Sequence, residues 1–286
     1  MSRFRHFAAI DWSGAVGARQ RGIAVALCSA GAHAPTLIVP EGGWSRTRAL
    51  DWLRKEMPAD TLVGLDLGPS LPFVDRGAFF PGWSETPPDA RALWALIERI
   101  CAHDPHLAAS SFVDHPEAAH HFRRHGNRKG KYFEGRGRLR VTEEAQRLQG
   151  LNPYSNLNLV GAAQVGKSSL TGMRVLHRLS GTLPIWPFDE SRAGSLVVEI
   201  YTSVAALAAG RRKGRTKIKS IAELNTALAT LGSATVAGDG VIDDHSSDAI
   251  VSAAWLRVAA DRPELWQPPA LTAQLARTEG WTFGVT

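Results

Sequence analysis

Cysteine is scarce in this chain of 286 residues, which contains two in all. Cys28 and Cys101 lie far apart and form no metal-binding or redox motif, so we expect reduced core thiols and a cytoplasmic protein. No apolar run approaches the roughly 18–20 residues that a membrane-spanning helix requires, so we expect no membrane partner. The first residues lead directly into an apolar run, so we expect no secretory signal.

Several signatures of catalysis are also missing from the sequence. There is no Gly-x-Ser-x-Gly nucleophile elbow and no Cys/His pair that would indicate covalent catalysis. Residues 115–121 contain His and Glu, but they lack the His-Glu-x-x-His spacing of a zinc-binding helix, so we interpret them as solvated. Hydrophobic residues make up 44% and charged residues 21%, which indicates a globular protein rather than a disordered one.

Basic residues exceed acidic ones, 33 to 27, which gives a formal net charge of +6. A basic chain favours contact with phosphates or acidic partners. Part of the excess lies in a glycine-rich stretch at 123–140, which we interpret as a loop that is either simply solvated or contacts nucleic acid. The candidate nucleic-acid contacts are Arg123, Arg124, Arg128, Lys129, Lys131, Arg136 and Arg138.

The first 70 residues show mostly strand patterns. Apolar runs at 7–10, 22–28 and 36–39 are close enough for antiparallel hairpins, and 62–67 predicts a strand buried on both faces. With an amphipathic helix at 45–57, this order predicts an α/β fold whose mixed sheet has three antiparallel strands, then parallel strands, and flanking helices. We expect one domain over 1–286 with a large helical and loop insertion at about 69–190.

Later elements are less regular. Helices are expected at 90–102, 168–179, 220–231 and 248–260, and strands at 111–114, 157–160 and 196–201. The last helix is apolar almost all round, which predicts burial against the sheet.

Four carboxylates stand in apolar surroundings. Asp11 ends the first strand, and Asp66 and Glu199 interrupt later ones. Asp248 opens the apolar last helix. Burying a carboxylate costs on the order of several kcal/mol without a partner, and divalent cations are one compensation that all four could share. Turns, a salt bridge and helix capping are the alternative explanations.

Asp244 and Asp248 are four residues apart and share a face if the helix starts early. Like charges at this spacing are destabilising by about 0.2–0.5 kcal/mol, and a cation between them would reverse the sign. If these aspartates only stabilise the N-terminal end of a helix, Ser246 or Ser247 is the expected N-cap.

The segments 9–14, 64–68, 198–201 and 244–250 together resemble the ribonuclease H-like nuclease fold. More narrowly, the chain is similar to a family of predicted nucleases with this fold, catalogued as a domain of unknown function. The family usually has Pro after the Tyr of the third segment, where this chain has Thr202. The resemblance implies that Mg²⁺ or Mn²⁺ is held by Asp11, Asp66, Glu199 and Asp248, with Asp244 as a further ligand.

The implied mechanism uses two metal ions. Asp11 would bridge them, with Asp66 on one and Asp248 on the other. Glu199 would complete a ligand shell or orient the attacking water.

Residues 161–168, Gly-Ala-Ala-Gln-Val-Gly-Lys-Ser, match the phosphate-binding loop pattern G-x-x-x-x-G-K-[ST] in full. A nucleotide-binding loop here would leave Asp11 and Asp66 unexplained, and no apolar run ending in Asp follows it. The narrower interpretation is that a substrate phosphate binds near a helix N-terminus. The candidate phosphate-binding residues are Ser13, Gly166, Lys167 and Ser168.

The sequence therefore predicts a metal-dependent nuclease that hydrolyses phosphodiester bonds in DNA or RNA. Two alternatives stay open. One is an ATP-binding phosphotransferase or P-loop-type NTPase that uses residues 161–168, and the other is a catalytically inactive nucleic-acid-binding module of the same fold.

Overall fold

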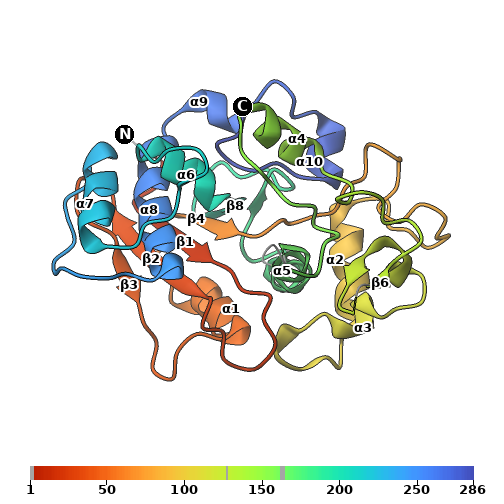
Figure 1. Ribbon diagram of the computed structural model, residues 1–286. Coiled ribbons are helices and arrows are strands. Elements are labelled where there is room, and N and C mark those ends of the chain that lie inside the picture. The colour runs from red at the N-terminus through yellow and green to blue at the C-terminus, as the bar shows by residue number, and fades with distance from the viewer. Residues whose placement is uncertain (1–2, 127, 162–164) are drawn as a thin grey trace.

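Six strands form one mixed sheet in the spatial order β3-β2-β1-β4-β8-β7 (Figure 1). The computed structural model describes residues 3–126, 128–161 and 165–286. The strands of this sheet are β1 (His6–Asp11), β2 (Ala24–Ser29), β3 (Thr36–Ile38), β4 (Thr61–Asp66), β7 (Ile185–Trp186) and β8 (Leu196–Glu199). A second small sheet consists of β5 (Arg123–Arg124) and β6 (Arg128–Lys129).

Strand direction changes at one place in the main sheet. β1, β2 and β3 are antiparallel neighbours, whereas β4 runs parallel to β1, and β8 and β7 continue in that direction. The predicted α/β class, with antiparallel and then parallel strands between helices, is therefore confirmed. The carboxyl ends of the parallel strands meet at one edge of the sheet, where open α/β folds bind ligands.

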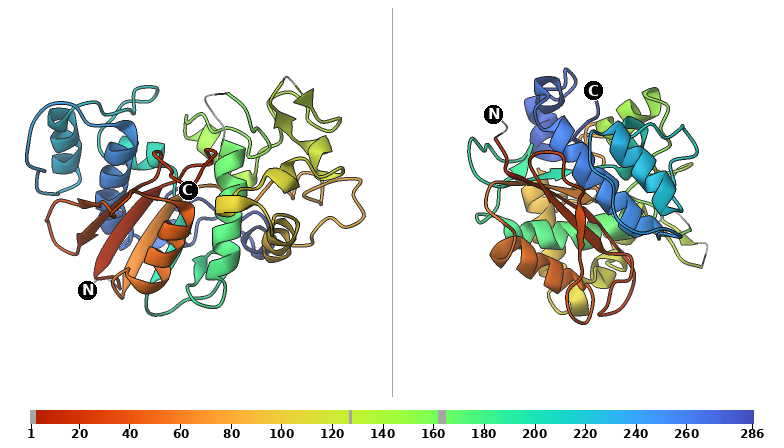
Figure 2. Two further views of the ribbon diagram at one scale, coloured as in Figure 1. Left: turned by 90° about the horizontal axis from the view of Figure 1, so that it is seen from below. Right: turned by 90° about the vertical axis from the view of Figure 1, so that its left-hand side faces the viewer.

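Helices lie on both faces of the sheet, as the blue helix α8 and the orange helix α1 show on opposite sides of the strands in Figure 2. On one face are α6 (Thr202–Ala208), α7 (Ile221–Thr230) and α8 (Asp244–Ala259). Beside the core of the other face are α1 (Arg46–Lys55), α2 (Ala90–Ile100) and α5 (Val165–Leu179). Side chains alternate between the two faces along β4, so that Leu62 joins the α8 core and Val63 the α5 core.

The remaining helices are short. They are η1 (Pro105–Leu107), α3 (Ser110–Val113), η2 (Ala118–His121), α4 (Val141–Leu148), α9 (Pro263–Trp266) and α10 (Ala273–Thr278). Among the residues placed by the structure, no helix combines the length and apolar character needed to cross a bilayer.

Two predicted strands are wrong. Residues 110–113 form helix α3, because a short apolar run does not by itself distinguish a helix from a strand. At 157–160 there is a single isolated bridge, between Asn158 and Arg123, in place of a strand.

Helix α8 begins four residues earlier than its apolar pattern predicts. Its N-cap is Asp243, whose side chain accepts a hydrogen bond from the Ser246 N–H at 2.9 Å, and neither predicted serine takes that position. The early start adds a polar first turn, which carries Asp244 and His245, to an otherwise buried helix.

Candidate active site at the strand ends

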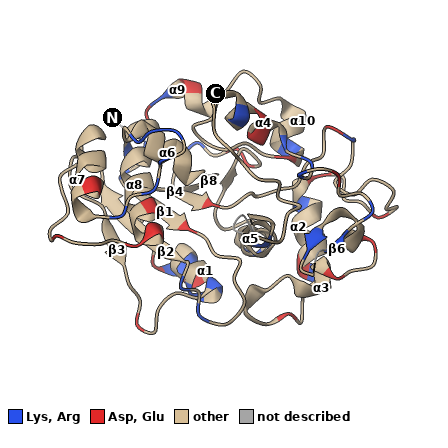
Figure 3. Cartoon of the chain, in the orientation of Figure 1, with Lys and Arg blue, Asp and Glu red and all other residues tan. Residues whose placement is uncertain are grey.

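Asp11 and Asp66 are the last residues of adjacent parallel strands, β1 and β4, and they are paired in register. Residues paired in this way point to the same face of a sheet. Alternate residues of a strand share a face, so Asp11 lies on the same face as Phe7, and Asp66 on the same face as Leu62. Helix α8 covers this face. Helix α8 carries Asp248 on its second turn, so three elements bring aspartates to one place (Figure 3).

The aspartates repel one another. Burial raises the pKa of Asp66 well above its ordinary value, and the negative charges of Asp11 and Asp248 raise it further. Burial also raises the pKa of Asp11 and of Asp248, although each has a basic neighbour that opposes the shift. These mutual effects show that the three carboxylates lie within electrostatic range of one another.

Two basic residues partly compensate this charge. Nδ1 of His245 lies 2.7 Å from Oδ2 of Asp11, and this hydrogen bond raises the pKa of the imidazole. Nζ of Lys217 lies 2.9 Å from Oδ2 of Asp248 and 3.6 Å from Oδ2 of Asp244. The ammonium of Lys217 is therefore the cation between the two aspartates of α8.

Little in the sequence indicates that either basic residue belongs to this site. Lys217 is one of six Lys and Arg residues between 211 and 219, and nothing in that stretch distinguishes it from the others. His245 lies inside one of the segments that carry the family resemblance, so its position next to Asp244 was the available signal.

The backbone N–H of Thr202 also opposes the effect of burial and lowers the pKa of Asp66 in part. Thr202 is the first residue of α6 and stands where the resembled family usually has Pro. Proline has no N–H, so the Thr202 N–H that lowers the pKa of Asp66 would be absent with the family's usual residue.

Glu199 does not join the three aspartates. It is paired in register with Leu65 and so points to the opposite face of the sheet from Asp66. Its carboxylate is held by the guanidinium of Arg140, with an Nη1–Oε2 distance of 3.0 Å, and by the hydroxyl of Thr282 at 2.9 Å. A salt bridge, the alternative to metal binding for this carboxylate, accounts for the surroundings of Glu199.

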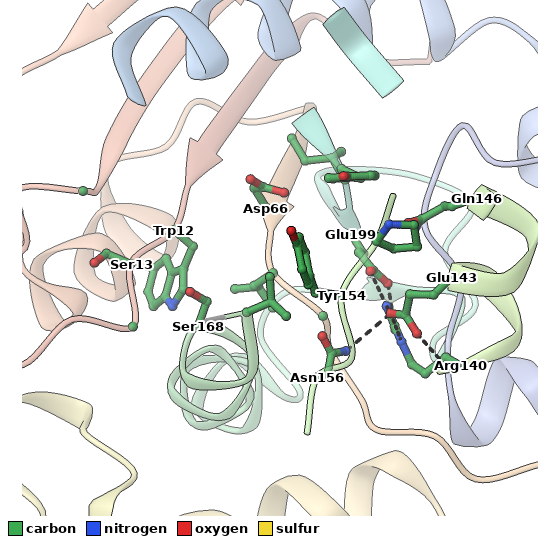
Figure 4. Close-up of a pocket in the computed structure, with 18 of the residues that line it drawn as sticks. Trp12, Ser13, Asp66, Arg140, Glu143, Gln146, Tyr154, Asn156, Ser168 and Glu199 are labelled. Carbon is green, nitrogen blue, oxygen red and sulfur yellow. Dashed lines mark hydrogen bonds and ion pairs between the residues drawn. The ribbon is translucent and has the colours of Figure 1, made fainter. Parts of the chain in front are cut away.

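A cavity of about 580 Å³ opens at the strand ends. Asp66 lies on one side of it, Arg140, Glu143 and Glu199 form a hydrogen-bonded group on the other, and Tyr154 stands between them (Figure 4). The cavity can therefore hold a molecule that contacts Asp66 at one end and the group around Arg140 at the other.

The candidate phosphate-binding residues are divided between two surfaces. Ser13 and Ser168 line the 580 Å³ cavity, whereas Nζ of Lys167 lies outside it, 2.9 Å from Nε2 of His125. Gly166 packs against the backbone of residues 156–158, where a Cβ would lie 2.4 Å from the carbonyl oxygen of Asn156. The side chains of Lys167 and Ser168 thus do not line the same cavity. Residues 162–164 of the motif lie outside the described ranges.

Five of the seven candidate nucleic-acid contacts are exposed, and Arg124 and Arg138 are half-buried. Arg138 is tied down by an ion pair with Asp75 and by the carbonyls of Pro72, Ala78 and Phe79, so its guanidinium is largely committed within the fold. The exposed members are Arg123, Arg128, Lys129, Lys131 and Arg136, while Arg124 is half-buried against Asp114.

The aspartates are chemically suited to a hard cation. Carboxylate oxygens are the ligands that Mg²⁺ and Mn²⁺ prefer, and the repulsion that remains around Asp66 is what a divalent cation would neutralise. In the ranges that the structure describes, however, no three His, Cys, Asp or Glu side chains are already gathered as a metal site. Lys217 and His245 stand beside the carboxylates instead.

Comparison of the chain with protein-family models, with curated proteins and with solved structures found no match. The function must therefore be inferred from the geometry and chemistry of the chain itself.

Proposed function

We propose that this protein is a metal-dependent phosphodiester hydrolase that acts on nucleic acid and has a ribonuclease H-like fold. The observation that carries the proposal is the meeting of Asp11, Asp66 and Asp248 at the carboxyl ends of the parallel strands. The sheet, with three antiparallel strands followed by parallel neighbours of β1, agrees with what the family resemblance implies.

Asp11, Asp66 and Asp248 would hold Mg²⁺ or Mn²⁺, with Asp244 at the margin. When bound, such ions activate water and stabilise the leaving oxygen in phosphodiester hydrolysis. Glu199 has no part in this proposal, because Arg140 and Thr282 engage its carboxylate on the other face of the sheet.

The chain's own residues would prepare the site. The hydrogen bond from His245 holds one oxygen of Asp11 in place. Ser13 and Ser168 line the cavity beside Asp66 and can donate hydrogen bonds to a phosphate. Exposed arginines and lysines of the 123–140 stretch would contact the nucleic-acid backbone, so binding should weaken steeply with salt.

The test is cleavage of labelled single- and double-stranded oligonucleotides of DNA and of RNA with Mg²⁺ or Mn²⁺. We expect cleavage that EDTA and Asp66→Asn abolish and that Asp239→Asn, an exposed matched control, preserves. If folded protein cleaves none of these substrates with either ion, or if Asp66→Asn cleaves as well as the parent protein, the proposal is wrong.

A catalytically inactive nucleic-acid-binding module is a second candidate, and Lys217 favours it. Its ammonium lies beside Asp248 and Asp244, so the chain supplies a cation of its own where a metal would bind. Thermal unfolding with and without Mn²⁺ separates the two candidates. Stabilisation of the parent protein by Mn²⁺ favours the hydrolase. If Mn²⁺ stabilises Lys217→Gln but neither the parent protein nor the exposed control Lys219→Gln, the binding module is favoured.

A further inference from the structure

A second, smaller cavity of about 210 Å³ lies on the other side of the loop that follows β1. Gly14 and Ala15 line both cavities, so the two are separated by this short segment of backbone. The loop packs tightly on α5, since a Cβ on Gly14 would lie 2.4 Å from the backbone nitrogen of Ser168. Because of this contact, Ser168 faces the large cavity while its neighbour Lys167 faces the small one.

The small cavity, here called the basic subsite, has mostly basic polar walls. Its basic lining residues are Arg46, Arg124, His125, Arg128 and Lys167. The acidic side chain in its lining is Asp114, which forms an ion pair with Arg124 at 3.0 Å. Four Lys and Arg side chains are thus opposed by a single carboxylate.

The basic side chains are held in place, mainly by groups that do not neutralise them. Arg46 is buried, with 2% of its surface exposed, and it donates hydrogen bonds to the carbonyl oxygens of Ser13, Ala15 and His106. Carbonyl oxygens orient a guanidinium but leave its full charge uncompensated. Arg46 therefore fixes the loop between the cavities and contributes positive potential to both of them.

The other basic groups have capacity left for a ligand. Nζ of Lys167 approaches one imidazole nitrogen of His125, which cannot neutralise it, and Nε of Arg128 donates to the carbonyl of His125. Nε of Arg124 is buried and has no hydrogen-bond partner among the residues described. A buried donor without an acceptor is unfavourable, and an oxygen-rich anion would relieve that cost.

We propose that the basic subsite binds a phosphate group of the nucleic acid, next to the phosphodiester that lies at the aspartates. The identification of the ligand as nucleic acid rests on the proposed function, whereas the anion chemistry follows from the cavity alone. Arg124, Arg128 and Lys167 would donate hydrogen bonds to the phosphate oxygens, and Arg46 would add charge from behind. The phosphate can be an internal one of the backbone or a terminal 5′-phosphate, which share this chemistry.

The experiment measures binding without catalysis. Fluorescence anisotropy in EDTA gives the affinity of a labelled ten-nucleotide DNA, with and without a 5′-phosphate, at several salt concentrations. We expect Lys167→Gln and Arg128→Gln each to weaken binding about tenfold, and the slope of log affinity against log salt to fall by about one. Lys55→Gln, a surface lysine on α1, is the matched control and should bind as the parent protein does.

Two comparisons identify the phosphate. A loss in Lys167→Gln that is confined to the 5′-phosphorylated DNA assigns the subsite to a terminal phosphate, and an equal loss for both DNAs assigns it to the backbone. The proposal would be overturned if both variants bound DNA with the affinity and salt slope of the parent protein. It would also be overturned if the parent protein bound neither DNA. Because metal is absent, weakened binding by the variants supports the subsite even if the parent protein proves unable to cleave nucleic acid.

Discussion

Asp66 is the residue whose charge is least compensated at the candidate site. Burial and two neighbouring carboxylates raise its pKa, and the backbone N–H of Thr202 offsets them only in part. Ionisable groups with strongly shifted pKa values in a cavity are concentrated at functional sites, because such an arrangement opposes stability. The carboxylate of Asp66 is therefore better explained by function than by folding.

Replacing Asp66 tests this interpretation. We expect Asp66→Asn to stabilise the metal-free protein by about 0.5–2 kcal/mol, because the repulsion from Asp11 and Asp248 disappears. Chemical denaturation in EDTA measures the change. The exposed control Asp239→Asn should leave the free energy of unfolding unchanged. A large destabilisation by Asp66→Asn would show that this carboxylate has a structural role.

His121 gives the protein a pH-dependent stability that is separate from the candidate site. Burial, with the positive charges of Arg138, His120 and Lys131, lowers the pKa of His121 to about 4. Its ring packs against Phe80 and Tyr132, with centroids 5.3 and 4.8 Å away. Folding therefore favours the neutral imidazole.

The sign of the effect follows from the lowered pKa. Above pH 6.5 the imidazole is neutral in both states, and stability is lost as the pH falls from 6.5 toward 4, by at most about 1.4 kcal/mol per pH unit. We expect His121→Phe, which keeps an aromatic ring, to lose less stability than the parent between pH 7 and 5. Urea denaturation at both values measures this, with the surface variant His103→Gln as control. Equal losses in parent and His121→Phe would show that this imidazole does not control the acid response.

At the scale of elements, local patterns predicted most of the fold. The apolar runs at 7–10, 22–28, 36–39 and 62–67 correspond to β1 to β4, and Ser45 caps α1 as its position suggests. Errors arose where the pattern was short or polar. Four residues at 111–114 could not distinguish helix from strand, and the polar first turn of α8 carries no apolar periodicity.

The first turn of α8 depends on its cap. Asp243 accepts the Ser246 N–H and so stabilises the turn that carries Asp244 and His245. We expect Asp243→Ala to cost about 1 kcal/mol of stability and to weaken Mn²⁺ binding, because that turn frays. Thermal unfolding with and without Mn²⁺ measures both effects. Asp243→Asn keeps an accepting oxygen and should cost much less, and equal losses in the two variants would show that charge, and not capping, is responsible.

At the scale of the whole molecule, a buried ion-pair group joins segments that are distant in the sequence. Arg140, with 1% of its surface exposed, precedes α4 and contacts Glu143, Glu199 on β8, and the carbonyl oxygen of Glu279 near the C-terminus. The carboxylate of Glu279 in turn accepts the N–H of Val141 at 2.7 Å. This group connects the region before α5 to the sheet and to the end of the chain.

Glu199 is therefore expected to matter for stability and not for metal binding. We expect Glu199→Gln to destabilise the protein by about 1–3 kcal/mol, because it weakens the buried hydrogen bonds from Arg140, which stays paired with Glu143, and to leave the stabilisation by Mn²⁺ unchanged. Denaturant titration with and without Mn²⁺ measures both quantities. Glu144→Gln, from an exposed pair with Arg147, should cost less than about 1 kcal/mol. Loss of the Mn²⁺ effect in Glu199→Gln would instead support the ligand role that the resemblance implies.

Sequence reasoning predicted part of the candidate site. The adjacency of Asp11 and Asp66 follows from two parallel strands that end at one edge of a sheet. The side to which Glu199 points depends on the register of β8 against β4, and a shift by one residue reverses it. The positions of Arg140 and Lys217 depend on packing between distant segments, which local patterns do not record.

The pairing of β4 with β8 has a consequence for how quickly the protein folds. β1, β2, β3 and β4 follow one another closely and can assemble early, whereas β8 joins β4 only after everything from α2 to β7 has been accommodated. Contacts between such distant segments slow folding, because chain entropy is lost before they form. The pairing that completes the parallel part of the sheet therefore favours slower folding than a sheet built from consecutive hairpins would show.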